Sequence, residues 1–266
     1  MVSFALDSSA LAESYDRVSD RQFNHGKLLL ADLGLRPGNF VLDVGAGTGR
    51  LSKYAASLVG PLGKVTAVDP LPLRIELARQ NAPANLEARV ARAEDLSEFA
   101  DASFDVVFLN SVFHWLPEKL TPLKEARRVL KRGGRLGIST ASRERPHDVE
   151  TVLARVFSRP ELRGEAEIPS GTPHKVSSAE LLRDLAEAGF VNVDLHVRSF
   201  TDHFANADEV LAFNLASSFG NFLSHLTPER RLAANRALEA ELERWRDAAG
   251  ITLQRHLIFA SARAGS

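Results

Sequence analysis

Cysteine is absent from this chain, and methionine occurs once among its 266 residues. The absence of cysteine excludes both a disulfide framework and a thiolate nucleophile. No apolar run approaches the ~20 residues that a membrane-spanning helix needs. The first residues, Met1 to Phe4, lack the basic start and long apolar core of a signal peptide. We therefore expect a cytoplasmic protein with no membrane partner.

The chain also has no marked excess of positive or negative charge. The 33 Lys and Arg residues nearly balance the 34 Asp and Glu residues, so the formal net charge is -1. No basic tract is present that would indicate a nucleic-acid partner. A hydrophobic content of 44% over this length predicts a globular protein with a sizeable core. These features leave the oligomeric state open.

The most informative stretch is a glycine-rich turn. An apolar segment, Phe40 to Val44, leads directly into Gly45, Gly47 and Gly49, and helix-forming residues follow. This order predicts a buried strand, a tight turn and a helix N-terminus. A turn without Cβ atoms lets the backbone lie against a ligand, while the helix directs its N–H groups towards that ligand. We therefore expect a polar ligand at this turn.

The spacing of the glycines restricts the type of nucleotide. The dinucleotide pattern G-x-G-x-x-G requires a glycine where Arg50 stands, which argues against a nicotinamide oxidoreductase. A second apolar strand, Lys64 to Asp69, ends in a carboxylate, at the position where α/β nucleotide sites bind a ribose. Asp69 is therefore a candidate ribose ligand. Asp69 would also suit the N-cap of a helix from Pro70 onward, and the two roles are compatible.

Four segments in order, LDVGAGTG, VTAVDP, FDVVFLNSVFHWL and LKRGGRLGIST, resemble the strand motifs of the class I S-adenosylmethionine-dependent methyltransferases of domain type 11. The resemblance is close over about residues 10 to 140. It implies S-adenosylmethionine as the cofactor. The residues that it places at the first two motifs as cofactor-binding are Asp43, Gly45, Ala46, Gly47, Asp69 and Pro70.

The N-terminal region predicts two helices, Ser9 to about Val18 and Asp20 to about Leu33. It is similar to the N-terminal segment of the malonyl-ACP O-methyltransferases, in which such a helix covers the methionine end of the cofactor. By this resemblance, Tyr15 and Gln22 are candidate cofactor ligands. The alternative is that Tyr15 packs in the core and that Gln22 is solvated.

After the third expected strand, Leu86 to Val90, the resemblance assigns adenine binding to the backbone of Ala93 and to Glu94. Methyltransferases of this kind have an acidic residue followed by a small one here, and Arg92 departs from that pattern. Glu94 would otherwise be an exposed acid at the start of a short helix.

The fourth expected strand, Phe104 to Leu109, leads into Asn110 and His114, which the architecture places near the methyl donor. Asn110 is a candidate cofactor ligand, and it stands where metal-dependent relatives have acids, so we expect no metal. His114 is a candidate general base, because histidine titrates near neutral pH. The alternative is that His114 packs beside Trp115.

The alternation of strands and helices predicts an α/β fold with a doubly wound, seven-stranded, Rossmann-like sheet, an N-terminal helical cover and a helical lid before the last strand. We expect residues 1–141 to hold the N-terminal helices and the cofactor-binding half, and residues 142–176 to form a flap. Residues 177–266 would complete the core and carry the lid at about 200–249.

Within this expected lid, two helices are predicted over residues 207–222 and 228–248, before a last strand over residues 253–261. Five of the fifteen phenylalanines fall within 23 residues of this expected lid. They predict either an apolar substrate pocket or a small satellite core. These five residues are Phe200, Phe204, Phe213, Phe219 and Phe222.

The expected activity is methyl transfer to a small-molecule or acyl-carrier-bound acceptor, either apolar or carboxylate-bearing. The chain is also similar to the trans-aconitate methyltransferases, so the sequence does not select the acceptor or the methylated atom. Two alternatives belong to other classes: a cofactor-binding protein without activity, and a nucleotide-dependent oxidoreductase.

Overall fold

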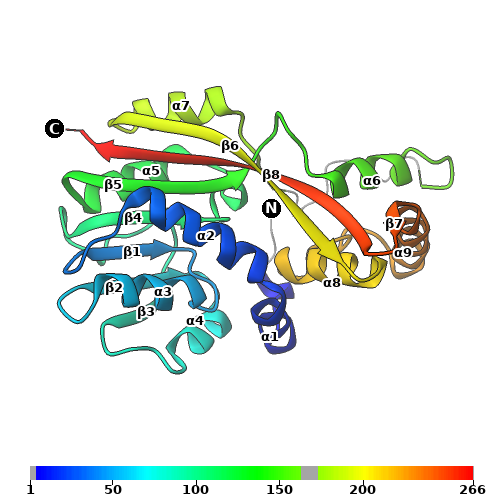
Figure 1. Ribbon diagram of the computed structural model, residues 1–266, viewed down its shortest axis with the longest axis horizontal. Coiled ribbons are helices and arrows are strands. Elements are labelled where there is room, and N and C mark those ends of the chain that lie inside the picture. The colour runs from blue at the N-terminus through cyan, green and yellow to red at the C-terminus, as the bar shows by residue number, and fades with distance from the viewer. Residues whose placement is uncertain (1–3, 163–172, 266) are drawn as a thin grey trace. The chain divides into compact units, whose positions relative to one another are not determined.

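A computed structural model describes residues 4–162 and 173–265 of the chain. Its strands form one sheet whose main path has the order β3-β2-β1-β4-β5-β8-β6, and β7 pairs with β8 outside this path (Figure 1). The seven strands of the path and the helices on both faces confirm the predicted doubly wound α/β fold.

The strands are β1 (Phe40–Val44), β2 (Lys64–Asp69), β3 (Leu86–Val90), β4 (Phe104–Asn110), β5 (Leu130–Ala141), β6 (Phe190–Phe204), β7 (Arg246–Asp247) and β8 (Gly250–Ala264). The α-helices are α1 (Ser9–Val18), α2 (Asp20–Leu33), α3 (Arg50–Val59), α4 (Pro72–Arg79), α5 (Leu120–Val129), α6 (Asp148–Phe157), α7 (Ser178–Glu187), α8 (Ala207–Ser217) and α9 (Pro228–Leu242). Short 3-10 helices are η1 (Phe4–Leu6), η2 (Phe113–Trp115) and η3 (Glu243–Trp245).

Strands β1 to β5 run parallel, with β1 between β2 and β4. Four of the five residues of β1 are buried, as expected for a strand that helices cover on both faces. Strand β8 pairs antiparallel with β5, from Arg135 opposite Arg263 to Ala141 opposite Leu257. Since parallel strands end at the same edge, the residues after β1, β2 and β4 meet there.

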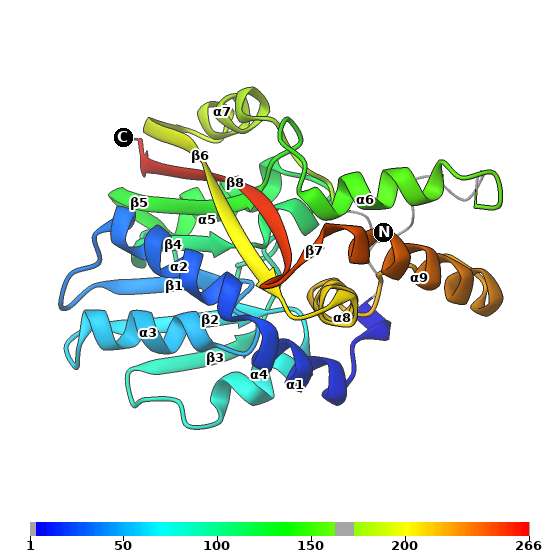
Figure 2. The same cartoon turned by 45° about the vertical axis from the view of Figure 1, so that its right-hand side comes forward.

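Helices cover the two faces of the sheet. On one face, Leu123 of α5 and Leu181 of α7 share a buried cluster with Leu42, Val107 and Ile138 of the strands. Figures 1 and 2 show α2 and α3 on the opposite face, with α2 in front of β4 and β5 and α3 in front of β1 and β2. The alternate side chains of each strand are therefore buried by a different set of helices.

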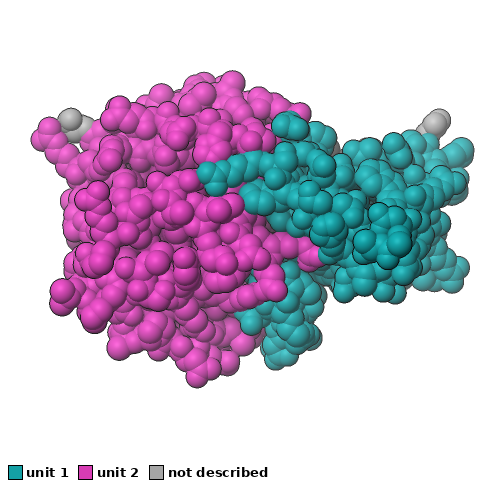
Figure 3. All heavy atoms as spheres, in the orientation of Figure 1, with its two compact units in different colours: residues 1–19, 145–173, 198–256 teal, residues 20–144, 174–197, 257–266 magenta. Residues whose placement is uncertain are grey.

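The chain divides into two compact units, coloured in Figure 3. Unit 2 contains residues 20–144, 174–197 and 257–266, and it includes the parallel half of the sheet. Unit 1 contains residues 1–19, 145–173 and 198–256. Unit 1 has its own apolar cluster, which includes Val152 of α6, Phe213 of α8 and Leu238 of α9. Strands β6 and β8 each contribute residues to both units.

Three predicted boundaries in unit 1 are wrong. Helix α8 ends at Ser217 rather than near residue 222, because Phe219 and Gly220 adopt positive φ angles of 57° and 78°. Helix α9 ends at Leu242, and Arg246–Asp247 pairs with the start of β8 as the short strand β7. Strand β8 accordingly begins at Gly250 instead of residue 253.

Other expectations about organisation stay predictions. The flap and lid boundaries are not tested by the two units, and residues 163–172 of the expected flap lie outside the described residues, as do Met1 to Ser3. Among the helices of the described ranges, none is both long enough and apolar enough to cross a bilayer.

Helix α2 passes unusually close to the cofactor half of the sheet at Gly26. A Cβ atom built on Gly26 would lie 2.6 Å from Leu51 Cδ2 and 2.9 Å from Asn110 Nδ2. We expect Gly26→Ala to lower the free energy of unfolding in urea denaturation, because overpacking of about 1–3 kcal/mol exceeds the ~1 kcal/mol that alanine gains as a helix former. The exposed neighbour Asn24 offers the control: Asn24→Ala should be neutral or stabilising. Equal stabilisation by both changes would show that α2 does not need this close approach.

Candidate active site

The turn after β1 leaves no space for side chains at its glycines. Gly45, Gly47 and Gly49 have φ angles of 77°, 56° and 77°, which L-residues with side chains rarely adopt. A Cβ atom on Gly45 would lie 2.2 Å from Val112 Cγ2, and one on Gly49 would lie 2.8 Å from the Cβ atom of Ala78. The glycines therefore set both the backbone conformation and the close packing of this turn.

Asp69, at the end of β2, holds the turn in place. Its Oδ2 atom accepts the backbone N–H of Gly47 at 2.9 Å, and its Oδ1 atom accepts that of Leu71 at 2.9 Å. The expected helix-cap role is wrong, because α4 begins at Pro72 with Leu71 at the cap position. Each carboxylate oxygen accepts more than one hydrogen bond. Asp69 therefore keeps the capacity to bind a ribose hydroxyl.

Asp43, the fourth residue of β1, is a second buried carboxyl group. Ser52 Oγ donates to Asp43 Oδ2 at 2.6 Å. Burial raises the pKa of Asp43 to about 7; the Ser52 hydrogen bond lowers this pKa and the charge of Asp69 raises it. A cation bound nearby would stabilise the ionised form of Asp43, so this group suits a positively charged ligand.

Gln22 and Asn110 meet at the carboxyl end of β4. Asn110 Nδ2 donates to the backbone oxygen of Gln22 at 3.1 Å, and Ser139 Oγ donates to Asn110 Oδ1 at 2.7 Å. Gln22 Oε1 is buried and accepts no hydrogen bond. The alternative that Gln22 is solvated is therefore wrong for this oxygen. An unsatisfied buried acceptor near the carboxyl end of β4 fits an N–H donor such as the ammonium group of a bound amino acid.

The remaining candidate ligands are less closely defined. Ala93 is buried, and Glu94 forms an ion pair with Arg92 at 3.6 Å, within a turn rather than a short helix. Pro70 follows Asp69 directly, and Ala46 donates its N–H to the Val68 oxygen. Tyr15 belongs to α1 in unit 1, so its role in cofactor binding stays a prediction.

His114 is buried in η2, on the segment that follows β4. Its Nδ1 atom accepts the backbone N–H of Ala141 at 3.3 Å and lies 3.2 Å from Thr140 Oγ1. Since a backbone N–H only donates, we infer that a neutral His114 ring carries its proton on Nε2. Its one basic nitrogen is then directed at β5. The ring also packs beside Trp115, at 5.1 Å between centroids.

Lys119 fixes the position of this segment. Its ammonium group donates to the backbone oxygens of Phe113 and Leu116, each at 2.6 Å, and of His174 at 2.7 Å. The His174 N–H in turn donates to the oxygen of His114 at 2.6 Å. Burial lowers the pKa of Lys119 to about 8, while nearby carboxylates act in the opposite direction. Lys119 thus ties the His114 segment to the residues before α7.

Sequence reasoning missed Lys119, and it also missed the buried His25 and its partner Ser111, which lie 2.9 Å apart. Their contacts join residues far apart in sequence, so no local pattern identifies them. The one available signal for Ser111 is its place directly after Asn110. In the described parts of the chain, no group of three or more His, Cys, Asp or Glu side chains has a geometry suited to a metal ion.

The chain is similar to known methyltransferases. Residues 42–138 match the methyltransferase domain family. The chain is 29% identical over 208 residues to a demethylmenaquinone methyltransferase of Staphylococcus aureus, covering 72% of this chain and 85% of that enzyme. A structure of a SAM-dependent methyltransferase from Aquifex aeolicus is 26% identical and has a TM-score of 0.54, covering 71% of this chain and 91% of that one.

A further neighbour supports the fold alone. A phosphoethanolamine N-methyltransferase from Haemonchus contortus, solved with S-adenosylmethionine, is 16% identical with a TM-score of 0.60, covering 97% of this chain and 58% of that one. The sheet order and the glycine turn define an α/β protein with a doubly wound, Rossmann-like sheet. More specifically, the chain is a class I S-adenosylmethionine-dependent methyltransferase, with S-adenosylmethionine as its cofactor.

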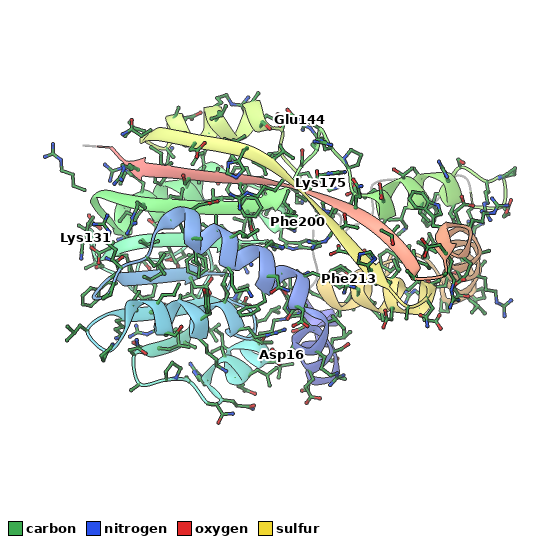
Figure 4. The ribbon with its side chains drawn as sticks, in the orientation of Figure 1. Asp16, Lys131, Glu144, Lys175, Phe200 and Phe213 are labelled. Atoms are coloured by element: carbon green, nitrogen blue, oxygen red, sulfur yellow. The ribbon has the colours of Figure 1, made fainter. Side chains whose placement is uncertain are left out.

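Two of the five phenylalanines, Phe204 and Phe213, are core residues of unit 1. Phe204 and Phe213 are buried in the unit 1 cluster with ring centroids 6.0 Å apart, and Phe222 packs against it. Phe219 packs edge-on against Phe4 at 6.0 Å. Figure 4 labels Phe200, which belongs to β6. The centroid of its ring lies 5.8 Å from the guanidinium carbon of Arg255. The satellite-core alternative therefore holds for Phe204 and Phe213, and they do not support an apolar pocket.

Asp43 should make stability depend on pH. The unfolded carboxyl group loses its proton near pH 4, whereas folded Asp43 keeps it to about pH 7, so its contribution falls as the pH rises between these values. We expect Asp43→Asn to become more stable relative to the wild type between pH 5 and pH 8, measured by urea denaturation. Asp194→Asn, an exposed change on β6, should show no such trend. A constant difference for Asp43→Asn would mean that Asp43 is already ionised at pH 5.

His114→Ala distinguishes the two roles of His114. A general base predicts a kcat that falls by two to four orders of magnitude. The hydrogen bond from Ala141 instead predicts a loss of roughly 1–3 kcal/mol in stability, because a buried N–H loses its acceptor, and a kcat within about tenfold of the wild type. We expect the second result from denaturation and single-turnover assays of the folded variant. A hundredfold lower kcat with intact cofactor affinity would establish the base.

Proposed function

We propose that the protein methylates a small molecule, and that this acceptor is an isoprenoid naphthoquinol of the demethylmenaquinol type. The observation that supports the acceptor is the similarity to demethylmenaquinone methyltransferase, which extends over 208 residues and 85% of that enzyme. It therefore extends well beyond residues 42–138, the part that matches the general methyltransferase domain. A carrier-bound acceptor has no comparable support.

The chain's own residues bind and orient the donor. Asp69 and the glycine turn would hold the ribose, and Gln22 Oε1 would accept from the ammonium group of the methionine part. Asp43 would supply a negative charge nearby. When bound, S-adenosylmethionine supplies a methyl group on a sulfonium, which needs no further activation. The protein's main contribution is then to place the acceptor in line with that group.

A naphthoquinol differs from a simple alcohol in how it reacts. Loss of a hydroxyl proton makes the adjacent ring carbon nucleophilic, so the methyl group is transferred to carbon while a proton leaves the acceptor. The site therefore needs a route for this proton as well as a place for the ring.

Calorimetry with S-adenosylhomocysteine tests the donor site. Asp69→Ala should weaken binding by about 1.5–3 kcal/mol, the scale of hydrogen bonds to a charged group, or roughly 10- to 150-fold. Asp101→Ala, which alters an exposed ion pair with Arg128, is the matched control and should bind as the wild type does. Unchanged affinity in folded Asp69→Ala would remove the ribose assignment.

The acceptor is tested with a labelled methyl donor and a chemically reduced, short-chain demethylmenaquinone. We expect label in a product that mass spectrometry identifies as the ring-methylated quinone. A wild-type protein that binds S-adenosylhomocysteine and leaves this quinol unmethylated would exclude the proposed acceptor while leaving the methyltransferase assignment intact.

A further inference from the structure

His25 and Ser111 form a buried histidine–serine pair at the cofactor edge of the sheet. His25, on α2, is 1% exposed, and its Nε2 atom lies 2.9 Å from Ser111 Oγ. Ser111 directly follows β4, and its φ angle of 60° is uncommon for a residue with a side chain. Its backbone N–H donates to the Ser139 backbone oxygen at 2.9 Å, and Ser139 Oγ lies 3.2 Å from the same nitrogen. β5 thus holds Ser111 in this conformation.

The contact between His25 and Ser111 depends on the close approach of α2 to the end of β4. Gly26 follows His25, and any side chain there would meet Leu51 and Asn110. Glycine inside a helix costs about 1 kcal/mol relative to alanine. Because Gly26 has no side chain, α2 can lie close enough to β4 for His25 to contact Ser111, which is 86 residues away in the sequence.

Ser111 and His25 differ in how far solvent can reach their side chains. Ser111 is partly exposed, whereas His25 is closed off from solvent. The direction of this hydrogen bond depends on the His25 tautomer, and in the tautomer with the ring proton on Nδ1 the Nε2 atom accepts the Ser111 hydroxyl proton. The lone pairs of Ser111 Oγ then remain to accept a hydrogen bond from a ligand. The serine hydroxyl therefore connects the accessible edge of the sheet with a base that no substrate can touch directly.

We propose that Ser111 and His25 form a proton relay that receives the hydroxyl proton of the acceptor during methyl transfer. This inference rests on the proposed function, because it requires an acceptor that releases a proton. Ser111 would contact the acceptor, and His25 would act through Ser111.

The relay balances in atoms and charge. The acceptor forms a bond to the methyl carbon, the methyl–sulfur bond breaks, and its electron pair stays on sulfur. The acceptor hydroxyl proton moves to Ser111 Oγ as the Ser111 proton moves to His25 Nε2. The methylated ring carbon then loses its hydrogen to water as a proton, and the imidazolium returns its proton through Ser111 to the ring oxygen, which restores the quinol. One positive charge disappears at sulfur as another appears at His25. The net charge of the site is thus unchanged during the step, which limits the cost of charging a buried imidazole.

His114 is less suited to this role. Its Nδ1 atom already accepts the N–H of Ala141, and that bond would be lost if the ring received a proton there. The Nε2 atom of His25 has a hydroxyl partner, which itself supplies the proton. The pair on α2 and β4 is therefore the better arranged proton acceptor.

The test uses the full chain with the reduced short-chain demethylmenaquinone. In His25→Gln, the glutamine Oε1 can accept from Ser111 yet cannot take up its proton, so packing and the hydrogen bond are replaced while basicity is removed. Ser111→Gly removes the hydroxyl and tolerates the positive φ. The matched control is His196→Gln, because His196 stacks on Phe259 at 5.9 Å and His25 packs edge-on against the same ring at 6.3 Å.

We expect His25→Gln and Ser111→Gly to lower kcat by about 100-fold or more, with S-adenosylhomocysteine affinity and acceptor KM within about threefold of the wild type. His196→Gln should retain the wild-type kcat. In His25→Ala, added imidazoles should restore turnover in proportion to their basicity, which a purely structural defect would not show.

Near-normal turnover of His25→Gln beside an active wild type overturns the relay and leaves the proposed acceptor intact. So does imidazole rescue that is independent of basicity. If the wild type binds S-adenosylhomocysteine and does not methylate the quinol, the proposed acceptor fails and the relay fails with it. If His25→Ala does not fold, the kcat of His25→Gln alone decides whether the relay holds.

Discussion

The backbone turn between β1 and α3 has no space for a methyl group at Gly45 or at Gly49, and the arrangement of the site depends on this constraint. Val112, after β4, fills the space beside Gly45, and Ala78 of α4 fills the space beside Gly49. The segments after β1, β2 and β4 are therefore held at fixed distances from one another by direct packing. Asp69 then joins the turn to β2 through the Gly47 N–H. A polar ligand meets a preformed surface here, and little ordering is required when it binds.

The sequence predicts this half of the protein well because its signals are local. A buried parallel strand is a short apolar run, and the ends of β1 and β2 were predicted at Val44 and Asp69, where the structure has them. Helix α7 also begins at a local signal, because Ser177 and Glu180 form a capping box directly around its first residue, Ser178. The carboxylates follow directly from these strand ends. Contacts such as that of Asn110 with Gln22 cannot be predicted from the sequence, because they depend on how α2 lies across the strands.

Unit 1 was predicted less well, for two physical reasons. Its helix α8 ends where a phenylalanine takes a positive φ angle, a choice made by tertiary packing and without a glycine at that residue to signal it. The two-residue strand β7 forms only because β8 is adjacent, so its residues have no strand pattern of their own. Aromatic composition was ambiguous as well, because phenylalanines in a small core and phenylalanines around a ligand have the same spacing. Burial of Phe204 and Phe213 decides for the core.

The three hydrogen bonds of Lys119 restrict which residues can replace it. Three backbone oxygens surround one nitrogen atom, and a tetrahedral ammonium group presents three donors from a single point. The guanidinium group of arginine distributes its donors over a flat fork and cannot direct three of them from one atom, so the positive charge alone does not make it a substitute. Neutral side chains would leave carbonyl groups unsatisfied in a half-buried position. As related sequences diverge, lysine at this position and the conformation of the segment that carries His114 should therefore change together or not at all.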